Sequence, residues 1–452
     1  LLPEISLTTD LFKRIEKRFG IKPVMWHSNL SKGKRKEIWQ DIFNGKSKLV
    51  IGARSSLFLP FKNLGLIIVD EEHDITYKQQ EGIIYHARDM AISLGFQEMA
   101  TVVLVSATPS LETIYNINEG KYSRLNLPKR VGKATLPSIK FIDMRDEEYK
   151  SQEWISESLK LEIKKSLSNG EQALIFLNRR GYAPLTLCKK CGSRIECPKC
   201  DSYLVEHKYN YRLICHQCGF SIKSVKDCKS CNSKNSLIAY GPGIERVTEE
   251  IISYFPDSRV ETLSSDNSLK SHEILSDMKN GLVDILVGTQ IISKGHHFPF
   301  LTCVGVIDAD LGMANGDLRA AERTYQLLHQ VAGRAGREDR KGRAFLQTYF
   351  PNHPVIQSLI KGARDEFIDT ELSIRKKNKL PPYGKLASII ISDKDEAKII
   401  SFCRALKKNI PLSKDVVVLG PAPASITKVR GRLRYRFLIK SNKDCLLYTS
   451  PS

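Results

Sequence analysis

The chain has 452 residues, of which 41% are hydrophobic, so it can form real cores, and a disordered or fibrous protein is excluded. At roughly 150 residues per domain, this length predicts about three domains. Lys and Arg number 70 against 50 Asp and Glu, and the net charge of +20 indicates a polyanionic partner, which is nucleic acid or, less often, an anionic membrane surface.

Apolar runs are too short for a membrane protein, because none approaches the 18 or so residues that a spanning helix needs, so no membrane partner is expected. No signal peptide is visible. The chain opens at Leu1, without Met, directly into an apolar segment. We therefore expect an internal piece of a longer protein.

Strand-like runs alternate with helical patterns along most of the chain, which is typical of parallel α/β domains. The predicted strands are Lys48–Ile51, Leu64–Val69, Val102–Val105, Ala173–Leu177, Asp284–Val287, Val304–Ile307 and Ala344–Thr348. The predicted helices lie near Asp10–Arg18, Lys32–Phe43, Ser156–Ser168 and Ala320–Val331. A linker at Leu127–Ser138 separates two α/β units, and short strands after about Asp365 predict a small α+β domain.

Eight of the eleven cysteines form four CxxC pairs, and they interrupt the second α/β unit as an inserted module. Each pair presents two thiolates on one tight turn, and two pairs complete a tetrahedral zinc site, so two Cys₄ zinc ions are predicted. The alternatives are a disulfide or redox role and an iron–sulfur cluster. The pairs are Cys188/Cys191, Cys197/Cys200, Cys215/Cys218 and Cys228/Cys231.

Acidic residues follow the apolar run that ends at Val69. Ligands bind at the carboxyl edge of a parallel sheet, where Asp70 can hold Mg²⁺ on a nucleoside triphosphate and Glu71 can polarise water. Ser106 and Thr108 end the next strand and can sense the state of these acids. Taken alone, solvated acids and an ordinary turn are the alternative interpretations.

An arginine signature runs from Gln330 through Arg334 to Arg337. The rigid guanidinium fork of arginine suits the charge that develops on a γ-phosphate, and a neighbouring domain can supply such an arginine to the nucleotide. The alternative interpretation of these arginines is a solvated basic helix end. Upstream, the turn that runs from Gly288 to His297 through Gly295 can meet nucleotide or nucleic-acid backbone. Its paired histidines lack further ligands at suitable spacing, so no metal is expected there.

Two basic features favour DNA as the partner. The cysteine block, 188–231, has nine Lys or Arg against four Asp or Glu. Near the end of the chain five cations occupy every second position, which predicts one strand face that can track phosphates. A solvated strand face is the alternative. These cations are Lys428, Arg430, Arg432, Arg434 and Arg436.

The DEEH, SAT, GTQ…KGHHF and QxxGRxxR motifs, in this order on two α/β units, resemble those of superfamily two helicases. The eight-cysteine insertion is similar to one family among them, the primosomal replication-restart helicase PriA family. Agreement extends from Leu1 to about Asn442. The resemblance implies an α/β fold with two RecA-like lobes of P-loop NTPase type at 1–135 (truncated) and 136–364. It also implies a zinc insertion at 186–235 and an incomplete C-terminal α+β DNA-binding domain at 365–445. Residues 446–452 follow no pattern of the preceding strand, so we expect them to be a non-native tail.

The resemblance also assigns roles. Asp70 and Glu71 would be the Mg²⁺-binding and water-activating acids, and Gln330, Arg334 and Arg337 the second-lobe residues. Ser106, Thr108 and Gly295 would couple nucleotide state to movement. The zinc pairing would be nested, with Cys188, Cys191, Cys228 and Cys231 on one ion and Cys197, Cys200, Cys215 and Cys218 on the other; spacing alone leaves consecutive pairing open. The loop Asp74–Asp89 would contact DNA, where a plain surface loop is the alternative. Its predicted contacts are Tyr77, Lys78, Tyr85 and Arg88.

One family motif is missing, the phosphate-binding loop GxxxxGK[ST]. Gly45-Lys46-Ser47 imitates it, but residue 40 is Gln and the segment precedes a strand. We expect the loop upstream of Leu1, and we expect this piece alone not to hydrolyse ATP.

The motifs and the resemblance together predict an ATP-dependent DNA helicase of replication restart that uses ATP, Mg²⁺ and two Zn²⁺. The resemblance implies 3′→5′ movement and action on single-stranded and branched DNA. The resemblance implies bacterial cytoplasm, at the nucleoid, and several protein partners. These are other primosome and restart proteins, single-stranded DNA-binding protein, and the replicative helicase or its loader. The rival functions are an RNA helicase, a translocase that does not unwind, and a zinc-dependent nucleic-acid-binding scaffold.

Overall fold

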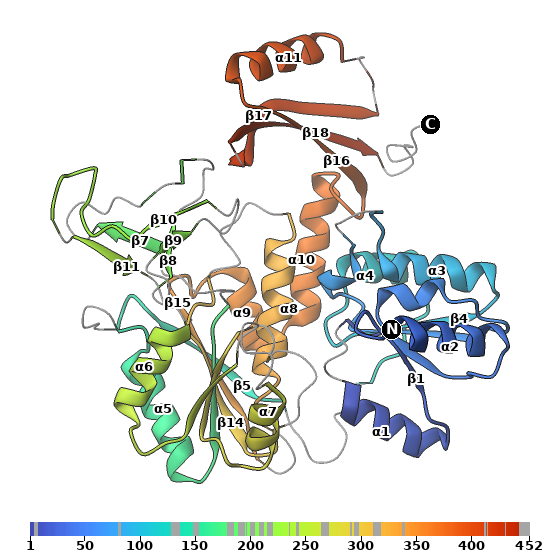
Figure 1. Ribbon diagram of the computed structural model, residues 1–452, viewed down its shortest axis with the longest axis horizontal. Coiled ribbons are helices and arrows are strands. Elements are labelled where there is room, and N and C mark those ends of the chain that lie inside the picture. Colours follow the sequence, from blue (N-terminus) through green and yellow to red (C-terminus); the bar gives the residue numbers. More distant parts are fainter. Residues whose placement is uncertain are drawn as a thin grey trace. The chain divides into compact units, whose positions relative to one another are not determined.

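The computed structural model describes residues 1–3, 8–79, 83–127, 136–147, 153–178, 185–188, 195, 197–198, 204–207, 212–214, 220–234, 236–240, 244–263, 271–289, 292, 298–310, 318–336, 340–410, 413, 415–429 and 431–442. The chain divides into two compact units, one of Leu1–Leu125 and one of Asn126–Ser293 with His297–Ser452 (Figure 1). Within these described ranges, no helix has the length and the apolar character needed to cross a bilayer.

The described part of the first unit contains two two-stranded sheets with helices around them, and β1 is parallel to β2 in one and β3 to β4 in the other. The first residues join the two pairs, because Leu2 N donates to Gly52 O and Asp70 N donates to Leu1 O. Its elements are α1 (Thr8–Phe19), β1 (Val24–Trp26), α2 (Lys32–Phe43), β2 (Val50–Gly52), η2 (Arg54–Phe58), β3 (Leu66–Asp70), η3 (Ile75–Tyr77), α3 (Ala87–Gln97), β4 (Thr101–Val105) and α4 (Leu111–Asn118).

Local sequence explains two of these elements. Helix α2 begins where the Ser31 side chain accepts from Lys34 N, which satisfies one of the unpaired amides of the first turn. Helix α3 packs on β4 at Gly95, where a Cβ would lie 2.2 Å from Val102 Cγ2. The core between α3 and the sheet contains Leu57, Ile67, Val69, Tyr77, Ala87 and Ala91.

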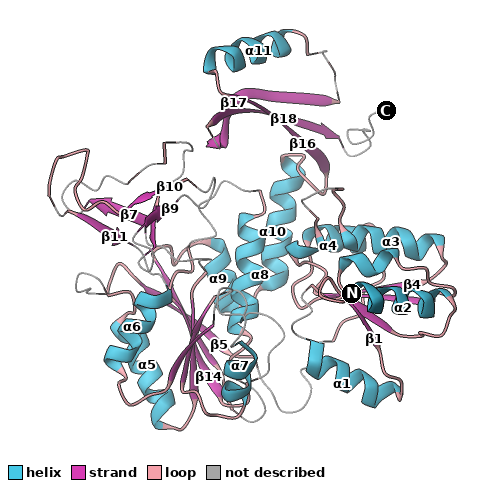
Figure 2. Cartoon of the chain, in the orientation of Figure 1, coloured by secondary structure: helices cyan, strands magenta, loops and turns pink. Residues whose placement is uncertain are grey.

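The second unit contains a six-stranded sheet in the order β12-β13-β6-β14-β15-β5, with all pairs parallel. Strands β6, β13 and β14 are buried along their whole length, because helices cover both faces of the sheet (Figures 1 and 2). The elements are β5 (Ser138–Asp143), α5 (Glu157–Ser168), β6 (Gln172–Phe176), α6 (Ile244–Tyr254), β12 (Val260–Leu263), α7 (Ser271–Lys279), β13 (Ile285–Gly288), β14 (Leu301–Val306), α8 (Ala320–Ala332), β15 (Arg343–Thr348) and α9 (Pro354–Lys361).

A small antiparallel sheet interrupts this lobe between β6 and α6, in the order β10-β9-β8-β7-β11. Buried Leu204 and Leu213 pack with Cys197 in its core. The five strands are short, and they are β7 (Leu185–Cys188), β8 (Val205–His207), β9 (Arg212–Ile214), β10 (Ser221–Lys223) and β11 (Leu237–Tyr240).

The C-terminal part is a three-stranded antiparallel sheet, β16-β18-β17, with α11 packed on one face (Figure 2). Ile399 and Cys403 of α11 pack against Phe437 of β18. Helix α10 leads into it from the second lobe. The bounds are α10 (Arg364–Lys377), β16 (Gly384–Asp393), α11 (Glu396–Lys408), β17 (Val416–Val429) and β18 (Arg432–Asn442).

The predicted α/β class is confirmed, and each predicted strand and helix has a counterpart whose ends differ by three residues at most. The predicted linker at Leu127–Ser138 lies mostly outside the described residues, and so does the predicted tail.

Candidate functional site

The predicted acids lie at the carboxyl end of β3, as the apolar run indicated. Asp70 pairs with Val105 of β4, and its Oδ1 accepts from Glu71 N at 3.0 Å. Burial raises the pKa of Asp70. No Lys or Arg of the described ranges forms an ion pair with this carboxylate, so a bound cation would relieve its desolvation. A hard carboxylate oxygen suits Mg²⁺, which binds proteins through one or two carboxylates plus substrate phosphates.

The turn after β3 is strained and is tied to the end of β4. Glu71 has φ 48°, in the left-handed region that non-glycine residues rarely adopt. His73 Nδ1 lies 2.7 Å from Ser106 Oγ, and Ser106 Oγ accepts from Thr108 N at 2.9 Å. His73 Nε2 is 3.5 Å from Thr108 Oγ1. The structure thus brings Ser106 and Thr108 into contact with the acidic turn through a histidine.

A buried ion pair lies beside this turn, and sequence reasoning missed it. Glu72 is 1% exposed and Arg88 is 8% exposed. Arg88 donates to Glu72 Oε2 at 3.0 Å and to Ser110 Oγ at 2.6 Å, while Ser110 N donates to Glu72 Oε1 at 2.7 Å. Burial opposes the charged guanidinium, but the carboxylates of Asp89 and Glu72 outweigh it and raise the pKa of Arg88. The pair therefore joins β3, α3 and the start of α4.

Two predicted DNA contacts of the loop Asp74–Asp89 need correction. The Tyr77 ring is fully buried in the core, and its hydroxyl donates to Asp70 O at 2.6 Å. Burial raises the pKa of Tyr77. The Tyr77 ring cannot stack on a base because core side chains surround it, and the Arg88 guanidinium is not available to a phosphate because it is buried and paired with Glu72.

The other two predicted contacts of this loop stay accessible. Lys78 is exposed, and Tyr85 is half-buried, edge-on to Phe58 with ring centroids 5.3 Å apart. Ile83 and Ile84 beside them are 82% and 69% exposed. Among the described residues 78–85, the exposed side chains of Lys78, Ile83 and Ile84 are basic or apolar, which fits a nucleic-acid contact.

The arginine signature follows α8. Gln330 lies in the last turn of that helix and Arg334 in the turn after it, whereas Arg337, Gln290 and Gly295 lie outside the described residues. Gly336 has φ +73°, and a Cβ there would lie 2.4 Å from Gly342 N. A close backbone crossing therefore demands glycine at position 336, between the two arginines of QxxGRxxR.

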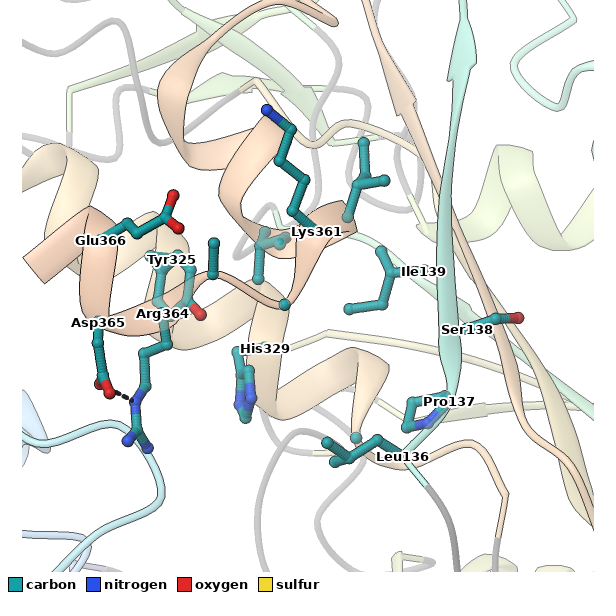
Figure 3. Close-up of a pocket in the computed structure, with 15 residues that line it drawn as sticks. Leu136, Pro137, Ser138, Ile139, Tyr325, His329, Lys361, Arg364, Asp365 and Glu366 are labelled. Carbon is teal, nitrogen blue, oxygen red and sulfur yellow. Dashed lines mark hydrogen bonds and ion pairs between the residues drawn. The ribbon is translucent and has the colours of Figure 1, made fainter. Parts of the chain in front are cut away.

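A cavity of about 580 Å³ lies beside α8 (Figure 3). Its walls include Tyr325, His329 and Gly333 of α8 or its end, together with Ile139 and Arg364. The Tyr325 ring stacks on Phe367 at 4.7 Å between centroids. Neither Gln330 nor Arg334 lines this cavity among the described residues, so it is separate from the predicted catalytic arginine.

The cysteine module is described in part. Cys197 and Cys228 are buried, and Cys231 is half-buried. Cys228 N donates to Ser233 O at 3.0 Å, which closes a turn that carries the last CxxC pair, and Cys231 Sγ lies 2.9 Å from Ser233 Oγ. Cys188 ends β7, and Cys191, Cys200, Cys215 and Cys218 lie outside the described residues. Thiolates on a tight turn are the donors that structural zinc prefers, so the described pair fits that ion.

The predicted cationic strand face needs a second correction. Lys428 belongs to β17, and Arg432, Arg434 and Arg436 belong to β18, across a turn at Gly431 with φ +76°. The three arginines alternate with Leu433, Tyr435 and Phe437, which face α11, so they share the open face of the sheet. Lys428 pairs with Leu433 and therefore points to the other face. Arg430 lies outside the described residues.

Four family models match parts of the chain. The family described as DEAD/DEAH box helicase matches residues 1–117, and Helicase conserved C-terminal domain matches residues 222–339. PriA DNA helicase Cys-rich region domain matches residues 197–223. Primosomal protein N C-terminal domain matches residues 376–446.

Among curated proteins, Replication restart protein PriA of Rickettsia conorii is 49% identical over 446 residues, which are 98% of this chain and 69% of that relative. The protein of the same name from Bacillus subtilis is 38% identical over 455 residues, covering 99% and 56%. Among solved structures, RecG bound to a three-way DNA junction has a TM-score of 0.42 at 14% identity, covering 84% of this chain and 39% of RecG. S. cerevisiae Dbp5 bound to RNA has a TM-score of 0.43 at 15% identity, covering 83% and 80%.

Proposed function

Since this chain belongs to the PriA family, we propose that its full-length form is an ATP-dependent helicase that recognises stalled or branched replication forks. It moves 3′→5′, unwinds DNA and helps to reload the replicative helicase. The observation that supports this most directly is the hydrogen-bonded junction of β3 and β4, where an acidic turn meets two hydroxyl side chains through His73.

The acidic turn performs the nucleotide chemistry in this proposal. Mg²⁺ bound with ATP neutralises charge on the phosphates. Asp70 is the residue that would hold the ion, and the neighbouring Glu71 would orient and polarise the attacking water. Arg334 and Arg337, with Gln330, would stabilise the charge that develops on the γ-phosphate. Gly295, Ser106 and Thr108 would report the nucleotide state.

The loop Asp74–Asp89 has two anchors on the catalytic strand. The Tyr77 hydroxyl donates to the carbonyl of Asp70, and Arg88 holds Glu72 two residues further on. DNA that displaces the accessible residues Lys78 and Tyr85 would therefore pull on the backbone that carries the acids. In this proposal Tyr77 and Arg88 transmit the DNA signal, although neither contacts DNA.

The zinc module and the C-terminal sheet would supply further DNA contacts and docking surfaces. Two zinc ions with the nested pairing would hold the module together. Arg434 and Arg436 form no ion pair with any carboxylate of the described ranges, so the open face of β18 can meet phosphates without reading sequence. The partners would be restart proteins, single-stranded DNA-binding protein and the replicative helicase or its loader, at the bacterial nucleoid.

The test measures ATP turnover and unwinding by the full-length protein on forked DNA, single-stranded DNA, duplex DNA and RNA. We expect strong stimulation by forked or single-stranded DNA, and loss of turnover in Asp70→Asn and Arg337→Ala. Turnover stimulated only by RNA, or only by duplex DNA without unwinding, would replace the proposal by one of the rival motors. Tight DNA binding without turnover would leave a zinc-dependent scaffold.

A further inference from the structure

Helix α2 carries an exposed aromatic stack. The rings of Trp39 and Phe43 lie parallel, with centroids 5.5 Å apart and planes 7° apart. Trp39 is 44% exposed and Phe43 is 57% exposed. A neighbouring face of α2 anchors the helix, because Ile38 and Ile42 are buried against Leu59. The stack is therefore not needed for the core of the unit, and two large exposed rings side by side mark an interaction surface.

Cations extend the same stripe of the helix. Lys36 and Lys32 precede Trp39 by three and seven residues, which places them on its face one and two turns away. Both lysines are exposed, and neither forms an ion pair with a carboxylate of the described ranges. The two acids of this segment are engaged elsewhere, since Glu37 pairs with Lys34 at 2.8 Å and Asp41 with Lys46 at 4.0 Å.

We propose that Lys32, Lys36, Trp39 and Phe43 form a binding surface for single-stranded nucleic acid. At about 1.5 Å per residue the stripe is about 16 Å long, enough for a few nucleotides. Bases would extend the existing ring stack, while the lysines meet phosphates. A duplex cannot offer its base faces to these rings, and a purely apolar protein surface would leave the lysines unmatched.

This surface differs from the sites of the proposed function, because none of its four residues belongs to a helicase motif or to the C-terminal sheet. Its binding is measured without nucleotide, so a failure of the proposed catalysis would not affect the result. The ring pair and the cations also make separate contributions, which separate variants can test.

The first experiment titrates the full-length protein with fluorescein-labelled oligothymidylate. Stacking contributes about 1 to 3 kcal/mol per base, so Trp39→Ala with Phe43→Ala should weaken binding at least about fivefold. Trp39→Leu with Phe43→Leu keeps apolar volume and helix propensity but removes the π faces, and it should weaken binding similarly. Phe96→Ala is the matched control, because Phe96 is 87% exposed on α3.

The second experiment follows the salt dependence of the same binding. Each phosphate contact on a single strand contributes about 0.7 to the slope of log K against log salt. Lys32→Gln with Lys36→Gln should therefore lower the slope by about 1.4. Lys164→Gln with Lys165→Gln changes two exposed lysines of α5 and should leave the slope unchanged.

A third experiment follows Trp39 itself, since a base stacked on its ring should quench its fluorescence. Oligothymidylate should therefore quench the fluorescence of the unchanged protein. The Trp39→Phe variant should lose that quenching and keep its affinity within about twofold. Unchanged affinity in both aromatic double variants overturns the proposal, and so does an equal loss for duplex DNA. Shielding of Trp39 from acrylamide in the DNA-free protein would overturn it as well, because another part of the protein would then cover the stack.

Discussion

Replacing Arg88 by Met should destabilise the first unit strongly. The guanidinium lies 3.0 Å from Glu72 Oε2 and 2.6 Å from Ser110 Oγ, inside a region where Glu72 is 1% exposed. Met retains most of the side-chain volume but removes the charge, so the Glu72 carboxylate stays buried without its cation.

Breaking a buried ion pair by removing one partner costs about 3 to 5 kcal/mol. Glu72 keeps two contacts with Ser110, from the backbone N–H at 2.7 Å and from the hydroxyl at 3.1 Å. These offset part of the loss, so about 3 kcal/mol is expected for Arg88→Met. The double variant with Glu72→Gln removes the orphaned charge as well, and we expect it to recover at least about 1 kcal/mol.

The assay is urea unfolding of the first unit, followed by Trp fluorescence. Trp26 and Trp39 lie in that unit, and Trp154→Phe removes the signal of the second. Asp89→Asn is the matched control, because Asp89 contacts the same guanidinium at 3.0 Å but its side chain is 62% exposed. Such an exposed pair is worth about 1 kcal/mol or less.

Two results would contradict this reasoning. A cost below about 1 kcal/mol for Arg88→Met would mean that water reaches the Glu72 carboxylate in the folded protein. A double variant as unstable as the single variant would mean that packing, and not the buried charge, holds β3, α3 and α4 together.

Three further predictions use other parts of the chain. Burial raises the pKa of Asp70, so the free energy of unfolding falls as the pH rises above the ordinary carboxyl pKa and the buried side chain ionises. Asp70→Asn should therefore abolish ATP turnover and yet unfold at an equal or higher urea concentration than the unchanged protein at pH 7. A lower urea midpoint would contradict this prediction. Burial raises the pKa of Cys303 to about 12, so iodoacetamide at pH 8 should leave it unlabelled until the protein is unfolded, as mass spectrometry would show. A strong chelator should release two zinc ions per chain, and hydrogen exchange should then rise in β7–β11 and not in β6 or β13; one ion, or exchange throughout the lobe, would refute the two-site module.

Sequence patterns alone predicted the parallel α/β class because both regular structures leave a periodic trace. Strands β6 and β13 are short apolar runs, as expected of strands covered on both faces, and α2 has the predicted bounds. The acids after β3 and the CxxC pairs were recognisable for a related reason. The acids after β3 and the two thiolates of each CxxC pair are close neighbours in the sequence, so their spacing along the chain is enough to indicate which ligand they can bind.

Tertiary structure decided which polar and aromatic residues face inward. Tyr77 and Arg88 have the composition of a DNA-binding loop, yet their partners Asp70 and Glu72 lie 7 and 16 residues away, and Ser110 lies 38 residues from Glu72. A polar group is stable in the core only when it meets its partner there, and that meeting depends on how α3 packs on β3. No local pattern records it.

The cationic residues at the chain end show the same limit. Alternation correctly predicted that Arg432, Arg434 and Arg436 share a face. The turn at Gly431 and the register shift between Pro423 and Lys428 send Lys428 to the opposite face of the sheet. Periodicity thus determined which residues of one strand share a face. Only the pairing of two strands decided which face of one strand lies beside which face of the other, because a register shift of one residue moves every side chain of a strand to the opposite face of the sheet.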